Sequence, residues 1–295
     1  MANMAGKKSL NMVARMIEYL LEPFSYNYMF KAIWICAVVG GVCAFISCYL
    51  MLKGWSLMGD ALAHSIVPGV ALAYLLALPY AVGAFFAGIL AALSMAIVKQ
   101  ETKLREDAVI GLVFTTFFAI GLIMVSINPT SVNIQAIILG NILAISDQDI
   151  VQVLIISFIC MLVLSVKWKD LMAVFFDENH ARSIGLPVNI LKITFFTLLS
   201  AACVAALQTV GACLVIAMVV TPGATAYLLT DKFNRLILIS VTLGSLTSAF
   251  GAYISYFFDA NPGGLIVSIQ TFIFLSAFLF APKYGLLKGK ANIHG

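Results

Sequence analysis

The chain has 295 residues, of which 62% are hydrophobic and only 10% are charged, and its formal net charge is +4. This composition excludes an ordinary soluble domain and predicts an all-α, polytopic membrane protein. The basic residues lie in short loops between apolar runs, so they carry information on membrane topology and do not predict nucleic-acid binding.

The first predicted element is an amphipathic helix at the membrane surface. Residues 12–30 place Arg15, Glu18 and Glu22 among apolar and aromatic side chains, which is the pattern of a helix that lies in the interface. We therefore expect an N-terminal interfacial segment (1–30), a transmembrane domain (31–282) and a cytoplasmic tail (283–295).

Long uncharged runs define the membrane spans that follow, because one span needs about 20 apolar residues. The runs are 32–52, 65–98, 108–146, 150–166, 193–230, 236–258 and 260–282. Two of them are long enough for two helices and are divided at Leu78-Pro79 and near residues 208–211. Asn128-Pro129 ends another helix, and the short segment 132–145 after it is not expected to cross fully.

The positive-inside rule orients these spans, because basic loops stay in the cytoplasm. Four basic clusters are expected on that side: Lys99/Lys103/Arg105, Lys167/Lys169/Arg182/Lys192, Lys232/Arg235 and Lys283/Lys288/Lys290. Counting back from them gives nine spans and an external N-terminus. Lys7, Lys8 and Arg15 favour an internal N-terminus with eight spans, and the sequence leaves both possibilities open.

All six cysteines lie within apolar runs and lack the spacing of zinc ligands. We interpret them as small buried apolar side chains and expect neither disulfides nor a metal cluster. They are Cys36, Cys43, Cys48, Cys160, Cys203 and Cys213.

A pair of ionisable residues, Asp60 and His64, stands out in an otherwise apolar run. An ionisable side chain inside a span is costly, rare and usually functional. A spacing of four residues places both side chains on one face of a helix. A carboxylate beside an imidazole suits a divalent first-row metal ion. We predict that the pair contacts a metal ion; the alternative is a helix cap with a histidine hydrogen-bonded in the core.

Two Pro-Gly pairs predict interrupted helices. One follows His64 by a turn, and the other, preceded by a threonine, lies in the second half of the chain. The residues are Pro68 and Gly69, and Thr221, Pro222 and Gly223. Interrupted spans in both halves indicate a translocation path. We interpret the hydroxyls of Thr221 and Thr225 as bonded to their own helix in preference to a metal.

The longest polar stretch between spans is residues 167–192. Within it, residues 176–187 predict a short amphipathic helix that ends at Gly185 and Pro187. These residues alone favour a solvated connecting helix over a docking element. The chain has no Walker A motif, so we expect it not to hydrolyse ATP. If it is part of a pump, the ATPase is another chain.

Residues 54–69 read Gly-Trp-Ser-Leu-Met-Gly-Asp-Ala-Leu-Ala-His-Ser-Ile-Val-Pro-Gly. They resemble the signature of permease subunits of bacterial ABC importers for manganese, iron and zinc, the ABC-3 type family. Residues 138–143, 176–187 and 215–226 resemble further stretches of that family, in the same order. The resemblance implies a type II permease fold, like that of vitamin B12 and metal-chelate importers, with eight or nine transmembrane helices in the bacterial plasma membrane.

The same resemblance implies a set of partners. These are a second copy of the permease, two ATP-binding cassette ATPase subunits, an extracytoplasmic metal-binding protein and the surrounding membrane lipid. The loop 167–192 would be the coupling element that docks into the ATPase, and the residues implied are Asp177, Glu178, Ala181, Gly185 and Pro187.

A divalent transition-metal ion would be the transported substrate, and we expect no cofactor bound to this chain. Manganese or iron is favoured, because Gly140-Asn141 followed by Asp147 and Asp149 is similar to that branch of the family. One Asp and one His without thiolates also favour these metals, since high-affinity zinc sites usually recruit more nitrogen and sulfur donors. A zinc permease of the same family is the alternative, and a secondary metal-ion transporter is a more remote one.

Overall fold

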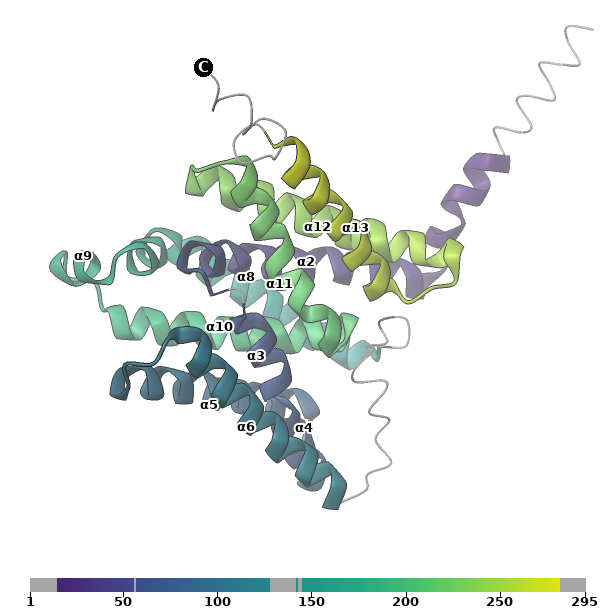
Figure 1. The fold of residues 1–295 in the computed structure, drawn as a ribbon. Coiled ribbons are helices and arrows are strands. Elements are labelled where there is room, and N and C mark those ends of the chain that lie inside the picture. The colour runs from purple at the N-terminus through teal and green to yellow at the C-terminus, as the bar shows by residue number, and fades with distance from the viewer. Residues whose placement is uncertain (1–14, 56, 128–141, 143–144, 282–295) are drawn as a thin grey trace, which may run out of the picture.

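The computed structural model describes residues 15–55, 57–127, 142 and 145–281. These residues are almost entirely helical and contain no strand, which confirms the predicted all-α fold. The helices, labelled in Figure 1, are α2 (Asn27–Lys53), α3 (Met58–Ser65), α4 (Val67–Leu75), α5 (Tyr80–Glu101), α6 (Glu106–Ile127), α8 (Asp147–Phe176), α9 (Glu178–Ser183), α10 (Val188–Val210), α11 (Ala212–Leu229), α12 (Phe233–Phe258) and α13 (Pro262–Phe280). A further helix covers residues 15–25.

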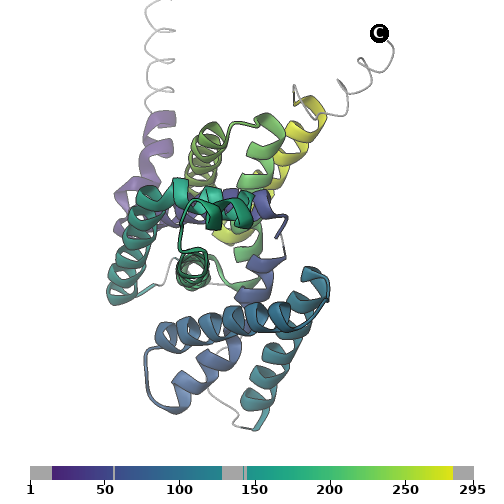
Figure 2. The same ribbon diagram turned by 90° about the vertical axis from the view of Figure 1, so that its left-hand side faces the viewer.

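Helix α2 is the centre of the bundle, and it packs against α8, α10, α11 and α12. The short helix α9 lies at one end of the bundle, and residues 15–25 lie at the other (Figure 1). We call these the α9 end and the opposite end. Seen from the α9 end, α4, α5 and α6 form a lobe on one side of α10, and α2 and α11–α13 lie on its other side (Figure 2).

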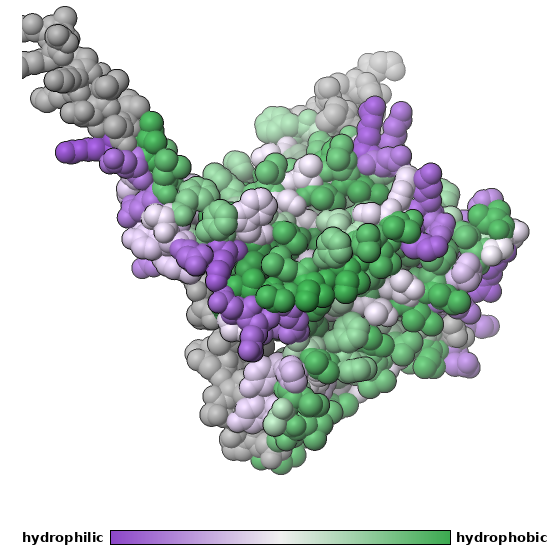
Figure 3. All heavy atoms as spheres, turned by 180° about the vertical axis from the view of Figure 1, so that it is seen from behind, coloured by the Kyte–Doolittle hydropathy of each residue, from purple (hydrophilic) through white to green (hydrophobic). Residues whose placement is uncertain are grey.

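The surface has the pattern of a membrane protein. Figure 3 shows a broad apolar zone, with hydrophilic residues gathered towards the two ends of the bundle. Within the described residues, eight helical segments are long and apolar enough to span a membrane, with α3 and α4 counted together. Helix α11 contributes a shorter apolar segment, Val215–Leu229. The bundle therefore matches the predicted eight or nine spans.

The two ends of α2 bear on the predicted topology. Tyr28, in the first turn of α2, lines a cavity at the opposite end together with Asp259 and Asn261. The last residue of α2, Lys53, pairs with Glu178 of α9. Basic residues of two predicted clusters, Lys99, Arg182 and Lys192, line one cavity near α9. The start of α2 therefore lies at the opposite end of the bundle from these clusters, as the nine-span alternative expects.

Several predicted boundaries shift in the structure. Helix α2 begins at Asn27, not after residue 30, and α8 continues through Lys167 and Lys169 to Phe176, so the connection to α10 is shorter than 167–192. The divisions at Leu78-Pro79 and at Gly211 are confirmed. The cysteines at positions 36, 43, 48, 160 and 203 are free and buried, as predicted. The predictions for segment 132–145, the tail 283–295, and the side chain of Cys213 fall outside the described structure.

The first Pro-Gly pair lies just after a helix break. Helix α3 ends at Ser65, and α4 starts at Val67 with Pro68 in its first turn. Gly69 also allows α4 to approach α5 until the two backbones touch at Gly83. Small residues permit such close approach between membrane helices.

The second Pro-Gly pair does not interrupt its helix, so the predicted break at Thr221, Pro222 and Gly223 is wrong. Helix α11 runs through Pro222 from Ala212 to Leu229. The hydroxyl of Ser47 on α2 accepts from the N–H of Gly223 at 3.1 Å and donates to the carbonyl of Val220 at 3.0 Å. A neighbouring helix thus satisfies the backbone groups beside the proline, which is how membrane helices tolerate one.

We expect Gly69→Val to destabilise the chain through overpacking. A Cβ atom at this position would collide with the Gly83 carbonyl and with the side chain of Ala87. The substitution should lower stability by about 1–3 kcal/mol, the usual range for added volume in a packed contact. Thermal unfolding of the purified chain in detergent measures it, and Gly111→Val is the matched control because Gly111 has open space around it. Equal melting temperatures for the two variants would contradict the prediction.

Candidate functional site

Asp60 and His64 both lie on the short helix α3, on the same face, as their spacing predicted. Nε2 of His64 is 3.3 Å from Oδ1 of Asp60. Each side chain is only partly covered, with 33% of Asp60 and 24% of His64 exposed. Oδ1 of Asp60 is itself buried and has no hydrogen-bond partner within the described structure. This is the oxygen that faces Nε2 of His64, but the contact lacks the geometry of a hydrogen bond. A buried carboxylate oxygen without a hydrogen bond is unusual, and together with the imidazole it could contact a metal ion.

The surroundings of the pair are apolar and closely packed. The His64 ring contacts Phe114 and Phe118 of α6, with ring centroids 5.6 Å away in each case. On another side of α3, Gly59 lies against Val219 of α11, where even a Cβ atom would be tightly placed. Helix α3 is therefore held between α6 and α11, and its two ionisable side chains have few polar neighbours to satisfy them.

Within the described residues, no group of three or more His, Cys, Asp or Glu side chains gathers as a metal site. Asp60 and His64 thus offer one carboxylate and one imidazole from a single chain, which is fewer donors than a structural metal site needs. Such a pair can hold a first-row divalent ion only weakly unless further ligands join it. Weak binding suits a transport path, because the ion has to leave as well as enter.

The second predicted site, α9, has well-defined ends. Oδ1 of Asp177 accepts from the N–H groups of Asn179 at 2.9 Å and His180 at 3.1 Å, so Asp177 is the N-cap. At the other end Gly185 has φ +80°. The N–H of Gly185 donates to Arg182 O, and the N–H of Leu186 donates to Ala181 O, each at 3.0 Å. These bonds form a Schellman motif, which a glycine completes without strain.

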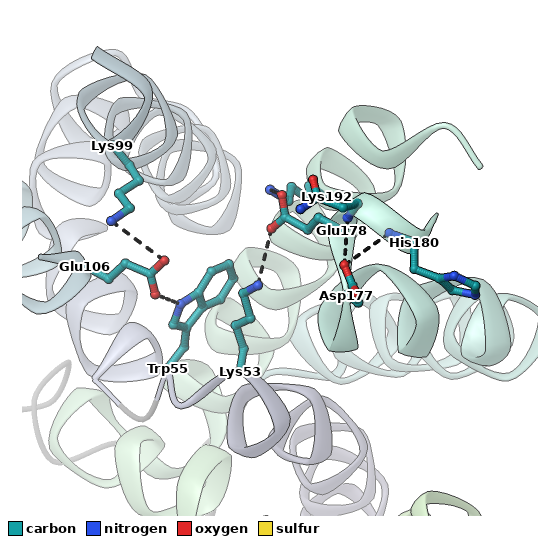
Figure 4. A network of polar contacts seen from close by, with 9 residues as sticks. Lys53, Trp55, Lys99, Glu106, Asp177, Glu178, His180 and Lys192 are labelled. Atoms are coloured by element: carbon teal, nitrogen blue, oxygen red, sulfur yellow. Dashed lines mark hydrogen bonds and ion pairs between the residues drawn. The ribbon is translucent and has the colours of Figure 1, made fainter. Parts of the chain in front are cut away.

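The same helix has an inner and an outer face. Ala181 is fully buried and Glu178 is half-buried, whereas Asn179, His180 and Arg182 are exposed. Oε1 of Glu178 is 3.3 Å from Nζ of Lys53, and Oε2 is 2.7 Å from Nζ of Lys192 (Figure 4). Pro187 follows as the N-cap of α10. The coupling residues predicted from the sequence therefore lie together, and Glu178 is the one that points back into the bundle.

The pKa of the Glu178 carboxyl is shifted downwards. Burial raises this pKa, but the hydrogen bonds and positive charges of Lys192 and Lys53 together lower it by more. The pKa therefore lies below its usual value. A depressed pKa means that the ionised carboxylate stabilises the attachment of α9. That contribution is complete above the unfolded pKa, near 4.3, and is lost as the pH falls through the lower folded value.

We therefore expect the attachment of α9 to be insensitive to pH between about 7 and 5 and to loosen only below about 4. A nitroxide attached to Ser183→Cys, on the exposed part of α9, would report this as increased mobility. The Glu178→Gln variant is the control and should show high mobility at every pH. Identical pH curves for the two proteins would show that Glu178 does not hold the helix.

Four residues that the sequence did not mark as part of a site tie these regions together: Lys53, Trp55, Glu106 and Lys192. Nε1 of Trp55 donates a hydrogen bond to Glu106, and Glu106 is 3.9 Å from Lys99 (Figure 4). Trp55 belongs to the conspicuous run 54–69, so a tryptophan five residues before Asp60 was the available signal. The partners of Trp55 come from other helices and could not be assigned from the sequence.

Comparisons with known proteins agree with this architecture. Residues 25–281 match the model of the ABC 3 transport family. The chain is 67% identical over 272 residues to the chelated iron transport system membrane protein YfeC of Yersinia pestis, and the match covers 92% of each chain. It is 49% identical over 270 residues to the manganese transport system membrane protein MntB of Synechocystis, covering 92% of this chain and 88% of that one.

Solved structures show the same fold. PsaBC from Streptococcus pneumoniae, in complex with Fab, has a TM-score of 0.83 and 34% identity, covering 93% of this chain and 99% of that chain. A metal-chelate type ABC transporter in an inward-facing conformation has a TM-score of 0.57 at 16% identity, covers 83% of each chain, and supports the fold alone. Both agree with the predicted type II architecture. The chain therefore belongs to the ABC 3 transport family and is a multi-pass membrane permease.

Proposed function

We propose that the chain is the permease subunit of an ATP-driven importer that carries manganese or iron ions across the bacterial plasma membrane, and that Asp60 and His64 contact the ion. The observation that carries this proposal is the pair on α3, 3.3 Å apart, with a buried Asp60 oxygen that lacks a hydrogen bond. The family membership and the names of the iron and manganese relatives support the substrate class.

Manganese and iron fit the donors better than zinc does. The described cysteines are buried, and none belongs to a group of three or more possible metal ligands. We therefore expect no thiolate ligand for the ion. A carboxylate and a neutral imidazole suit Mn²⁺ and Fe²⁺, whereas tight zinc sites recruit more nitrogen and sulfur donors. The zinc permease is therefore the second candidate, and a secondary transporter is disfavoured because the family is that of ABC transporters.

A second copy of the permease would complete the site. Asp60 and His64 remain partly exposed in the single chain although α3 is part of an apolar span. Exposing ionisable groups to lipid costs several kcal/mol, so a protein or aqueous surface has to cover them. Two copies related by a two-fold axis would bring together two carboxylates and two imidazoles, enough donors for one transient ion.

The outer face of α9 would dock into a separate ATPase, which supplies the hydrolysis that this chain is not expected to perform. Asn179 and His180 are exposed there, and Asp177, Ala181, Gly185 and Pro187 set the shape of the helix and its ends. An extracytoplasmic metal-binding protein would deliver the ion at the opposite end. The helix of residues 15–25 and the exposed apolar side chains would face membrane lipid.

Reconstitution tests the proposal. The chain would be placed in proteoliposomes with its ATPase and metal-binding protein, and accumulation of manganese, iron and zinc would be measured separately, with and without ATP. We expect ATP-dependent accumulation of manganese or iron that exceeds that of zinc. Preferential zinc accumulation would favour the second candidate, and accumulation driven by an ion gradient without ATP would refute the importer.

A further inference from the structure

We propose that Glu178 is a positioning residue: through Lys53, Trp55 and Glu106 it fixes helix α3, so that Asp60 and His64 move together with α9. The inference rests on the proposed transport function and adds to it a physical connection between the ATPase-facing helix and the ion site. The chain of contacts runs across the α9 end of the bundle (Figure 4).

The first step is the direction in which Glu178 points. It forms ion pairs with Lys53 of α2 and Lys192 of α10, at 3.3 Å and 2.7 Å, and its side chain is 28% exposed. It therefore lies on the permease side of α9, away from the exposed residues that a partner would reach. Any movement of α9 has to carry Lys53 and Lys192 with it or break both ion pairs.

The second step leads from Lys53 to Trp55. Lys53 is the last residue of α2, and Gly54 ends that helix with φ +75°, which folds the chain back so that Trp55 N–H donates to Leu50 O at 2.8 Å. Nζ of Lys53 lies 5.9 Å from the centroid of the Trp55 ring, within the range of a cation–π interaction. Lys53 is thus in contact with Glu178 on one side and with Trp55 on the other.

The third step fixes Trp55 against three helices. Its ring stacks on Phe196 of α10, with centroids 5.7 Å apart and planes at 21°. The edge-on ring of Phe175 of α8 is 5.5 Å away. Nε1 donates to Glu106 of α6, a charge-assisted hydrogen bond. Trp55 therefore joins the lobe of α4–α6 to the helices that carry α9.

The last step leads from Trp55 to the ion site. The N–H of Met58 donates to Trp55 O at 3.1 Å, so the first turn of α3 starts directly from the tryptophan. Asp60 follows Trp55 by five residues, and a helix transmits displacement along its axis as a rigid body. A cavity of about 520 Å³, lined by Trp55, Met58, Glu178 and Lys192 among others, leaves room for these side chains to move.

Coupling between transport and hydrolysis tests this role. In proteoliposomes with the ATPase and the metal-binding protein, we expect Glu178→Gln to lower manganese transported per ATP hydrolysed by roughly three- to tenfold, as residues in coupling networks do. Hydrolysis by the assembled complex should persist. Glu178→Asp, which keeps the charge, should fall between the two. Asp170→Asn is the matched control, because Asp170 forms its ion pair with Lys167 on the same helix, at 3.2 Å, and not with another helix of the described structure.

Trp55 fluorescence supplies a readout that a merely structural role would not change. The chain has three tryptophans, so a Trp34→Phe/Trp168→Phe background leaves Trp55 as the only tryptophan of this chain. The same complex with Trp55→Phe added gives the emission of the partner proteins, which is subtracted. Trapping the ATPase with ATP and vanadate should shift the Trp55 emission in this background, and Glu178→Gln or Lys53→Met should abolish that shift.

The outcomes separate the two proposals. If the unsubstituted complex does not accumulate manganese or iron, the proposed function fails whatever Glu178 does. If it does accumulate them, an unchanged transport ratio together with an unchanged Trp55 shift in Glu178→Gln would overturn the positioning role. If Glu178→Gln does not assemble with the ATPase, the test is the Trp55 emission spectrum of the purified full chain without its partners. A spectrum that differs between Glu178→Gln and the Trp34→Phe/Trp168→Phe background supports the connection, and identical spectra refute it.

Discussion

Asp60→Asn and His64→Gln are each expected to reduce manganese uptake by at least about a hundredfold, while the protein still reaches the membrane. Both substitutions keep a side chain of similar volume, so the packing of position 64 against Phe114 and Phe118 should be retained. What they remove is the carboxylate charge or the imidazole nitrogen. Because no third His, Cys, Asp or Glu side chain joins this pair among the described residues, losing either one leaves too little to hold an ion.

The control for this prediction lies on the same helix. The Ser65 hydroxyl donates to Ala61 O at 2.6 Å, within α3 itself, so Ser65→Ala changes a neighbouring polar group without touching the pair. It should transport normally. Binding of Mn²⁺ to the purified full chain, followed by the electron paramagnetic resonance signal of the free ion, gives a second measurement that does not need the ATPase. Normal uptake and unchanged Mn²⁺ binding in both site variants would refute the assignment.

The parts of the fold that sequence could predict are those set by local chemistry. Uncharged runs define the spans because lipid excludes charge, and proline or glycine near Leu78, Gly211 and Asp259 divides them where the structure has turns. The capped helix α9 was predictable for the same reason, because Asp177 and Gly185 carry their own signals for a helix start and end. The shared face of Asp60 and His64 follows from helix geometry alone.

The errors arise where another helix decides the outcome. Pro222 was expected to interrupt α11, but Ser47, 175 positions away in the chain, satisfies the backbone groups beside it, so the helix continues. Gly69 lies beside the predicted break, but its close approach to Gly83 of α5 could not be foreseen from the sequence. Likewise, the side-chain partners of Trp55 and Glu178 come from four helices, α2, α6, α8 and α10. None of these contacts has a local sequence signal, since each depends on how distant segments pack.

The contacts at the α9 end also suggest why α9 has two kinds of residue. Asp177 and Gly185 give the helix its shape through local hydrogen bonds, and Glu178 attaches it to α2 and α10. Substitutions of the two kinds should therefore fail differently. Loss of the attachment should separate transport from hydrolysis, whereas loss of shape should impair both together, because a misshapen α9 could not dock.

Gly185→Val is expected to lose transport and stimulated ATP hydrolysis together. Gly185 has φ +80° and no atom within 4 Å of the position of a Cβ, so a valine side chain would meet no obstacle in space. Its cost is conformational: an L-residue in the left-handed region costs about 1–2 kcal/mol, and a β-branched residue is among the least tolerant. The chain would relieve that strain by unwinding the Schellman turn, which displaces Leu186 and Pro187 and tilts α9.

Gly185→Asn is the matched comparison, because asparagine adds a side chain to the same open space but adopts the left-handed conformation readily. It should keep most of the transport and hydrolysis that Gly185→Val loses, and Gly185→Ala should lie between them. Gly111→Val, at an equally open glycine in the regular helix α6, controls for the addition of a valine as such. The measurement is ATPase activity and manganese uptake of the same reconstituted complexes. If valine and asparagine at position 185 behave alike, the turn geometry does not govern docking.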